Sequence, residues 1–218
     1  MRGYMTWLEA NTRNSISPGD RLRLLLDKPN ILEVPGAHNA FCGLIAKKLG
    51  FKSLYVSGGA LTTSMGLPDL GVLTIEELCS VTRMIFRATD LPLIVDGDTG
   101  YGETLNVMRT TRELELAGAA GVQIEDQVLQ KKCGHLNDKK LISPIEAADK
   151  ISAMKKATDK LVIIARTDAA SVEGIGGAIQ RGNLYVEAGA DVVFPDALTD
   201  AKSFRYFAQS VSGPKMAN

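Results

Sequence analysis

The sequence predicts an α/β protein, a (β/α)8 barrel of the TIM type in which parallel strands alternate with helices. Three observations support this prediction. Strand-like apolar runs alternate with helical patterns along the chain, polar residues directly follow five of these runs, and no Gly-x-Gly-x-x-Gly turn of a dinucleotide-binding fold follows the first run. We expect one barrel domain over residues 1–218.

Seven segments are short, apolar and rich in β-branched residues, as strands buried on both faces are. Short connections between strands and helices favour parallel strands joined by right-handed crossovers. The expected strand segments are NILEVPG (30–36), SLYVSGG (53–59), LPLIVDGDTG (91–100), GVQIED (121–126), LVIIARTD (161–168), DVVFPDA (191–197) and GPKMAN (213–218).

The segments between these runs show helical patterns. Pro144 stands near the start of one pattern, and Gly50, Gly118 and Gly189 close others, as the preferences of helix ends predict. The expected helical segments are AFCGLIAKKLG (40–50), TIEELCSVTRMIFRATD (74–90), NVMRTTRELELAGAA (106–120), SPIEAADKISAMKKATDK (143–160) and GGAIQRGNLYVEAGA (176–190).

The position of the polar residues favours a barrel over an open doubly wound sheet. A barrel gathers the carboxyl ends of all its strands around one mouth, whereas an open sheet spreads them along an edge. These residues are Ser57, Gly58 and Gly59, then Asp96 and Asp98, Glu125 and Asp126, Arg166 and Asp168, and Asp196.

A barrel of this type needs eight strands and usually about 250 residues. The chain reaches Asn218 inside the seventh strand segment. We therefore expect the C-terminal part, the eighth unit, to be missing from this chain, which would be truncated at the seventh strand.

Composition narrows the classes of function. The chain is 45% hydrophobic with zero formal net charge and no long basic run, so we expect no nucleic-acid partner. No apolar run approaches the ~20 residues that span a bilayer, and we expect no membrane partner. Three cysteines at unrelated positions do not form a disulfide framework. The expected location is cytoplasmic, and the expected partner is a small molecule.

The run VDGDTGYG presents two carboxylates, Asp96 and Asp98, at the end of a buried strand. Oxygen ligands of this kind suit Mg²⁺ or Mn²⁺, and Glu125 at the end of the next strand would add a third carboxylate. Alternatively, the aspartates only accept turn hydrogen bonds. We favour a metal site.

Other polar residues have two interpretations each. Ser57, Gly58 and Gly59 could cradle a carboxylate or form a tight strand-to-helix turn. Asp69 alone is more typical of a turn than of a ligand. Arg166 follows a fully apolar run and would be costly to bury without an anionic partner, which favours a role at the site.

The loop KKCGH, residues 131–135, places a thiol and an imidazole beside two lysines. Neighbouring cations favour the thiolate of a cysteine. The segment is therefore more typical of an active-site loop than of a structural one, and Cys133 is its candidate reactive residue.

These segments together resemble the isocitrate lyase/phosphoenolpyruvate mutase superfamily. KKCGHL is similar to its isocitrate lyase signature, and YVSGG, GLPDLG, VDGDTGYG, IEDQ, ARTDA and FPDA occur in the superfamily order over nearly the whole chain. The resemblance implies a barrel of the phosphoenolpyruvate/pyruvate-domain type. This compact chain lacks the long insertions of isocitrate lyases. It therefore resembles most the branch that cleaves 2-methylisocitrate into pyruvate and succinate, in the methylcitrate cycle of propionate breakdown.

The resemblance implies a retro-aldol (retro-Claisen) cleavage of a tricarboxylate chelated by Mg²⁺, with Mn²⁺ as the alternative metal, in a homotetramer. Cys133 would be the general acid, and Tyr55 is the candidate base. Further implied catalytic residues are Lys131, His135 and Arg166; implied substrate contacts are Ser57, Gly58, Gly59, Gly134, Asp196 and Asn218; implied metal-site residues are Asp96, bound directly, with Asp98, Glu125 and Asp69.

Some positions depart from the pattern of this branch. Asp196 stands where Glu is usual, Gln123 where His is frequent, and Lys132 and Leu136 replace arginines. The alternatives are therefore an isocitrate lyase, which releases glyoxylate and succinate, and a catalytically silent barrel subunit. Phosphonopyruvate mutases and oxaloacetate decarboxylases fit less well because they lack the Cys-Gly-His loop.

Overall fold

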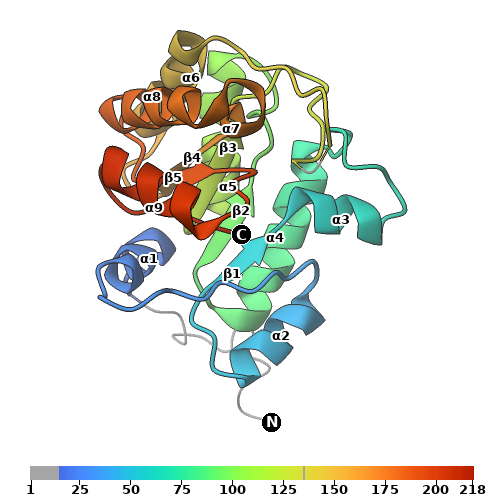
Figure 1. Cartoon of the computed structure of the whole chain (residues 1–218). Coiled ribbons are helices and arrows are strands. Elements are labelled where there is room, and N and C mark those ends of the chain that lie inside the picture. The colour runs from blue at the N-terminus through green and yellow to red at the C-terminus, as the bar shows by residue number, and fades with distance from the viewer. Residues whose placement is uncertain (1–14, 135) are drawn as a thin grey trace.

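The computed structural model describes residues 15–134 and 136–218. One sheet of five parallel strands runs through this part of the chain, and its spatial order is the order of the strands in the sequence (Figure 1). This is the strand order of a barrel, as predicted, because a doubly wound sheet reverses its order at a switch point. The strands are β1 (Leu54–Val56), β2 (Leu93–Asp96), β3 (Gly121–Glu125), β4 (Val162–Thr167) and β5 (Val192–Pro195).

The expected first and seventh strands are reduced to single bridges. Gly36 pairs in parallel with Tyr55, and Lys215 pairs in parallel with Val193. The prediction of full strands at 30–36 and 213–218 was therefore wrong. Pro35 and Pro214 offer a physical reason, because a proline has no N–H to donate to a ladder. The two bridges still continue the parallel order on both sides of the five-stranded sheet.

A cavity of about 670 Å³ is lined by both of these edge segments and by inward side chains of the sheet. Within residues 15–134 and 136–218, no strand joins the two edges. The architecture is thus an incomplete barrel, in agreement with the predicted fold class. The cavity lining includes Val34, Tyr55, Ile94, Ile164 and Met216.

All five predicted helical segments contain a helix, and the described part of the chain has four further helices that were not predicted. The helix α1 is capped by Ser17, whose side chain accepts a hydrogen bond from Asp20 N, and has Pro18 in its first turn. This signal of a helix start was present in the sequence. The helices are α1 (Pro18–Leu26), α2 (Ala40–Lys48), α3 (Gly58–Ser64), α4 (Ile75–Thr89), α5 (Thr104–Ala117), α6 (Pro144–Ala157), α7 (Ala169–Val172), α8 (Gly174–Glu187) and α9 (Ala201–Ser210).

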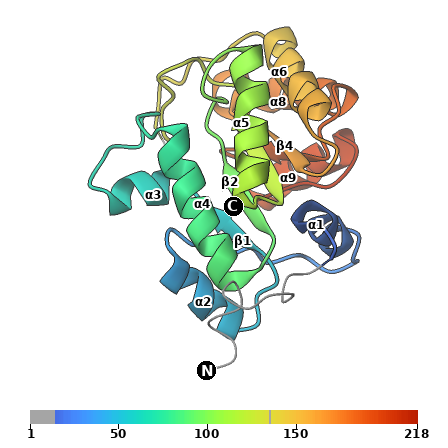
Figure 2. The same ribbon diagram turned by 180° about the vertical axis from the view of Figure 1, so that it is seen from behind.

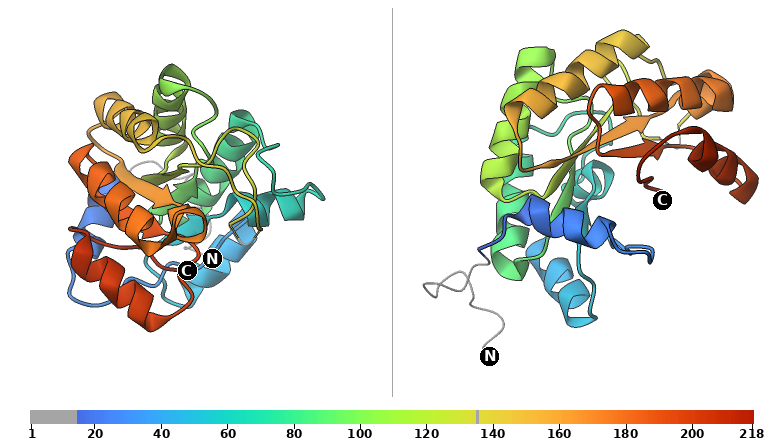
Figure 3. Two further views of the ribbon diagram at one scale, coloured as in Figure 1. Left: turned by 45° about the horizontal axis from the view of Figure 1, so that its top comes forward. Right: turned by 90° about the vertical axis from the view of Figure 1, so that its left-hand side faces the viewer.

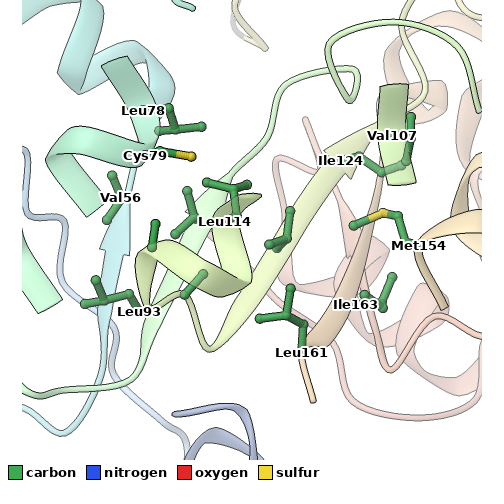
Figure 4. Close-up of a cluster of buried hydrophobic side chains, with 14 of the residues drawn as sticks. Val56, Leu78, Cys79, Leu93, Val107, Leu114, Ile124, Met154, Leu161 and Ile163 are labelled. Atoms are coloured by element: carbon green, nitrogen blue, oxygen red, sulfur yellow. The ribbon is translucent and has the colours of Figure 1, made fainter. Parts of the chain in front are cut away.

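The helices α4, α5, α6, α8 and α9 follow one another around the outer face of the sheet (Figures 2 and 3). The main core lies between these helices and the strands and includes Leu114, Ile124, Met154 and Ile163 (Figure 4). Such burial of apolar side chains is the main stabilising term of the fold. No helix in the described ranges is long and apolar enough to cross a membrane.

Candidate active site at the carboxyl ends of the strands

The carboxyl ends of the strands carry the polar residues that the sequence pattern singled out. Because the strands are parallel and in register, Asp96 lies beside Gln123, and Glu125 lies beside Arg166. The segment between β3 and α6, yellow in Figure 1, extends from the end of β3 toward α3. These side chains therefore meet at one end of the sheet, with the Cys133 segment near them.

Asp96 is buried and accepts hydrogen bonds at both carboxylate oxygens. Its Oδ2 accepts from the backbone N of Gly58 at 3.2 Å, and its Oδ1 accepts from the backbone N of Asp98 at 3.2 Å and from Gln123 Nε2 at 3.3 Å. All three donors are neutral groups, and they fix the orientation of the carboxylate. Asp96 is therefore held in place without an ion-pair partner among the described residues.

Asp98 lies in the turn after β2 and pairs with a lysine from the Cys133 segment. Lys131 Nζ is 2.9 Å from Asp98 Oδ1 and also donates to Asp69. Burial, and then the nearby charge of Asp96, raise the pKa of Asp98 to about 6. Lys131, which is itself buried, thus bridges the turn after β2 and the loop after α3.

Glu125 is buried at the end of β3 with one oxygen paired and one unpaired. Its Oε2 lies 3.3 Å from Arg166 Nη1, whereas its Oε1 has no hydrogen-bond partner among the residues that the structure describes. Burial raises the pKa of Glu125 well above its usual range, against the opposing effect of Arg166. An orphaned buried carboxylate oxygen needs a partner such as a cation or a bound water.

These residues fit a Mg²⁺ or Mn²⁺ ion held mostly through water. In the described part of the chain, no group of three or more Asp, Glu, His and Cys side chains could hold a metal together directly. Mg²⁺ needs no such cage, because it binds through one or two carboxylates and keeps several waters. Asp96 supplies a buried carboxylate, and Glu125 Oε1 supplies a carboxylate oxygen that has no hydrogen-bond partner among the described residues.

Arg166, at the end of β4, is surrounded by the carboxylates of Glu125, Asp168 and Asp196. Its Nε and Nη2 donate to the two oxygens of Asp168 at 3.1 and 2.9 Å, and its Nη2 is also 3.3 Å from Asp196 Oδ2. Its guanidinium lies 5.5 Å from the ring centre of Phe194. Arg166 is thus buried with carboxylates of the protein itself as its anionic partners, and its role toward a substrate stays a prediction.

Lys139 is a buried member of this cluster that sequence reasoning missed. Its Nζ donates to Asp168 Oδ1 at 2.8 Å, to Asp196 Oδ2 at 3.4 Å and to the carbonyl oxygen of Gly134 at 2.8 Å. In the sequence it is one of two adjacent lysines in a polar loop, and Lys140 beside it is exposed. No local pattern distinguishes the two.

The segment that carries Cys133 is braced by Gln127, a second residue that sequence reasoning missed. Gln127 Oε1 accepts from the backbone N of Lys132 at 3.0 Å, and its Nε2 donates to the carbonyl of Lys132 at 2.9 Å. Gln127 also forms an antiparallel bridge with Leu141, which closes the base of the segment. Cys133 itself is half-buried. His135 lies outside the described residues.

Tyr55, the candidate base, faces the same cluster from β1. Its hydroxyl donates to Gln123 Oε1 at 3.0 Å, and Gln123 in turn donates to Asp96. Burial and the charge of Asp96 raise the pKa of Tyr55 well above its ordinary value. A phenol in this state holds its proton, which disfavours its use as a base at neutral pH.

The remaining predicted residues lie at the edges of the site. Ser57 caps α3 by accepting from Ala60 N, and Gly58 N donates to Asp96, so two of the three predicted anion-cradle groups already have protein partners. A Cβ at Gly59 would touch Asp69. Asn218 lines the 670 Å³ cavity instead of contacting the carboxylates.

Asp126 points away from this cluster, to the helical side of the sheet. It accepts hydrogen bonds from Thr167 Oγ1, from the backbone N of Asp168 and from Tyr185 OH, and lies 3.3 Å from Arg181 Nη1. Successive side chains of a strand point to opposite faces, so Glu125 and Asp126 could not both face the mouth. The expectation that Asp126 converges there was wrong.

The sequence matches known proteins over most of its length. The family described as phosphoenolpyruvate phosphomutase matches residues 22–217. The chain is 51% identical over 214 residues to 2-methylisocitrate lyase of Halalkalibacterium halodurans, covering 98% of this chain and 71% of that protein. It is 52% identical over 201 residues to 2-methylisocitrate lyase of Aeropyrum pernix, covering 92% of this chain and 65% of that protein.

Solved structures agree with the sequence matches. Crystalline 2,3-dimethylmalate lyase, a member of the PEP mutase/isocitrate lyase superfamily, superposes with a TM-score of 0.87 at 33% identity, covering 93% of this chain and 70% of that one. Phosphonopyruvate hydrolase in complex with oxalate and Mg²⁺ superposes with a TM-score of 0.83 at 29% identity, covering 92% and 71%. The chain therefore belongs to the phosphoenolpyruvate mutase/isocitrate lyase family.

Proposed function

We propose that this chain carries the catalytic strand ends of a Mg²⁺-dependent carbon–carbon lyase that cleaves 2-methylisocitrate into pyruvate and succinate. The observation that carries the proposal is the cluster of buried carboxylates with an unpaired Glu125 oxygen, next to Arg166 and the Cys133 segment. Its curated relatives at 51% and 52% identity are named 2-methylisocitrate lyases.

In this proposal Asp96 would hold Mg²⁺, with Asp98, Glu125 and Asp69 as the further residues of the metal site. When bound, the metal polarises the hydroxyl and carboxylate oxygens of the substrate and stabilises negative charge that develops on them. The protein residues supply fixed positions for the charged groups before substrate arrives, which avoids reorganisation during the reaction.

Cleavage of the carbon–carbon bond leaves its electron pair on the carbon that becomes part of succinate, and that carbon needs a proton. Cys133 is the proposed proton donor, and Gly134 next to it packs against Arg166 and Asp196. Arg166 is proposed to bind a substrate carboxylate, for which its guanidinium would exchange part of its present pairing with Asp168 and Asp196. Because Tyr55 retains its proton, it serves better as a hydrogen-bond donor than as the base.

The testing experiment compares wild type, Cys133→Ser and Cys42→Ser for Mg²⁺-dependent pyruvate release from 2-methylisocitrate, with glyoxylate release from isocitrate assayed in parallel. Cys42 is a half-buried cysteine near His38 and away from the site, so its substitution is the matched control. We expect Cys133→Ser to lower kcat by about 10²–10⁴-fold, the usual contribution of general acid–base catalysis. Unchanged turnover in Cys133→Ser contradicts the proposed proton donor, and preferential cleavage of isocitrate supports the alternative substrate.

The homotetramer implied by the resemblance is a further proposal, as is the cytoplasmic location expected from the sequence. Sedimentation equilibrium of the purified protein tests the first directly. A monomer at micromolar concentration would contradict it.

A further inference from the structure

Lys139 links the Cys133 segment to the carboxylates after β4 and β5, and all three N–H donors of its ammonium group have an acceptor. An ammonium has three hydrogens to donate, and the Nζ of Lys139 has three acceptors: the carbonyl of Gly134, Asp168 Oδ1 and Asp196 Oδ2. Its side chain is only 2% exposed. Burial of a charge at this depth is favourable only when partners of this kind compensate for lost hydration.

The two carboxylates that Lys139 contacts are also the partners of Arg166. Asp168 Oδ1 lies 2.8 Å from Lys139 Nζ and 2.9 Å from Arg166 Nη2, and Asp196 Oδ2 lies 3.4 and 3.3 Å from the same two nitrogens. Two cations and two anions therefore alternate in one closed network. Arg166 belongs to the strand end, whereas Lys139 belongs to the segment that carries Cys133.

Gly134 shows how closely this segment lies against the network. A Cβ added at Gly134 would collide with both Asp196 Oδ2 and Arg166 Nη2. The carbonyl of the same residue accepts a hydrogen bond from Lys139 at 2.8 Å. The backbone next to Cys133 therefore lies directly against Asp196 and Arg166 and is also hydrogen-bonded to Lys139.

We propose that Lys139 is a positioning residue that fixes Gly134, and with it Cys133, above Arg166 by linking the Gly134 carbonyl to Asp168 and Asp196. The inference deepens the proposed function, because its consequence for turnover rests on Cys133 as the proton donor. Lys139 contacts none of the proposed metal-site residues. Its loss should therefore disturb the proton-donor segment and leave metal binding unchanged.

The test compares Lys139→Met with Lys140→Met, which removes the same charge at the adjacent, exposed position. Hydrogen exchange followed by mass spectrometry measures the backbone protection of residues 128–141, with α6 as the internal reference. Loss of a buried, charge-assisted contact should speed exchange of this segment about tenfold in Lys139→Met. Exchange in Lys140→Met and in α6 should match wild type.

Kinetics of the same variants separate positioning from general stability. We expect Lys139→Met to lower kcat. The affinity of the substrate-free protein for Mn²⁺, measured as the Mn²⁺ concentration that gives half of the maximal rise in Tm, should stay unchanged. Lys139→Arg, which keeps the charge and several donors, should recover part of the lost kcat and of the lost protection. Equal exchange in Lys139→Met and wild type, or equal effects of Lys139→Met and Lys140→Met, would overturn the inference.

Gly134→Ala supplies a second test if Lys139→Met does not fold. It keeps Lys139 but places a methyl group against Asp196 and Arg166, so protection of residues 128–141 should again fall. Unchanged protection in Gly134→Ala would contradict the close approach on which the inference depends. The exchange readout needs no substrate, so an inactive wild type with the expected exchange differences would refute the proposed function alone.

Discussion

The two sides of the strand-end site differ in how completely their carboxylates are paired. On the β4–β5 side, Asp168 and Asp196 are both neutralised by Arg166 and Lys139. On the β2–β3 side, Asp96 receives only neutral donors, and Glu125 Oε1 has no partner among the described residues. The same kind of side chain is therefore in two different electrostatic states in one site.

This difference assigns different tasks to the two sides. Burial and the nearby charge of Asp96 raise the pKa of Asp98, and Glu125 Oε1 has no partner in the described ranges, so we expect a divalent cation to stabilise the β2–β3 side. A carboxylate that already has two cationic partners gains less from a metal, so the β4–β5 side instead holds Arg166 and the Cys133 segment in position. Glu125 connects the two sides, because its Oε2 pairs with Arg166 while its Oε1 has no partner among the described residues.

The largest expected effect comes from Asp96→Asn on the metal side. Loss of the carboxylate proposed to contact the metal should lower kcat/KM by about 10³-fold and abolish the thermal stabilisation that we expect Mn²⁺ to give to wild type. Turnover assays and thermal unfolding with and without Mn²⁺ measure both effects. Asp149→Asn, at an exposed position of α6, is the control. Retained Mn²⁺ stabilisation in Asp96→Asn would place the metal elsewhere.

An effect of similar size, but on stability, is expected from Arg166→Gln on the paired side. The change leaves Asp168, Asp196 and Glu125 with one cation fewer, and breaking a buried ion network costs about 3–5 kcal/mol. Urea unfolding without metal gives the free energy of unfolding directly. Arg109→Gln removes an exposed arginine whose pair with Glu113 spans 3.8 Å, and should cost under about 0.5 kcal/mol. Similar losses in the two variants would refute the contrast between paired and unpaired sides.

The smallest effect is expected from Gly58→Ala. A Cβ there would lie 3.3 Å from both Asp96 Oδ2 and Asp98 Oδ1, closer than usual, so both carboxylates must shift slightly. Displacement of groups that orient a metal ligand typically weakens metal affinity about 10-fold or more, and titration with Mn²⁺ measures it. The control is Gly176→Ala in α8, where a Cβ meets nothing within 4 Å. Unchanged Mn²⁺ affinity in Gly58→Ala would mean that Asp96 and Asp98 do not depend on this close contact.

Much of the site could be predicted because strand ends are visible in the sequence. Asp96, Glu125 and Arg166 each end an apolar run, and parallel pairing brings such positions to one end of the sheet. The same rule fails for Asp126, because side chains alternate between the two faces of β3 and only Glu125 faces the site. The edge segments failed as strands because Pro35 and Pro214 limit pairing to single bridges.

The amino-acid sequence by itself determined the parallel α/β architecture, since burial on both faces produces continuous apolar strands and helices show their own period. It also determined which side chains lie at the strand ends. Only the tertiary structure decided which of two adjacent lysines is buried, which oxygen of Glu125 is unpaired and how Gly134 packs on Arg166. These features depend on contacts between residues far apart in the chain, and local sequence patterns do not contain the path of a loop through space.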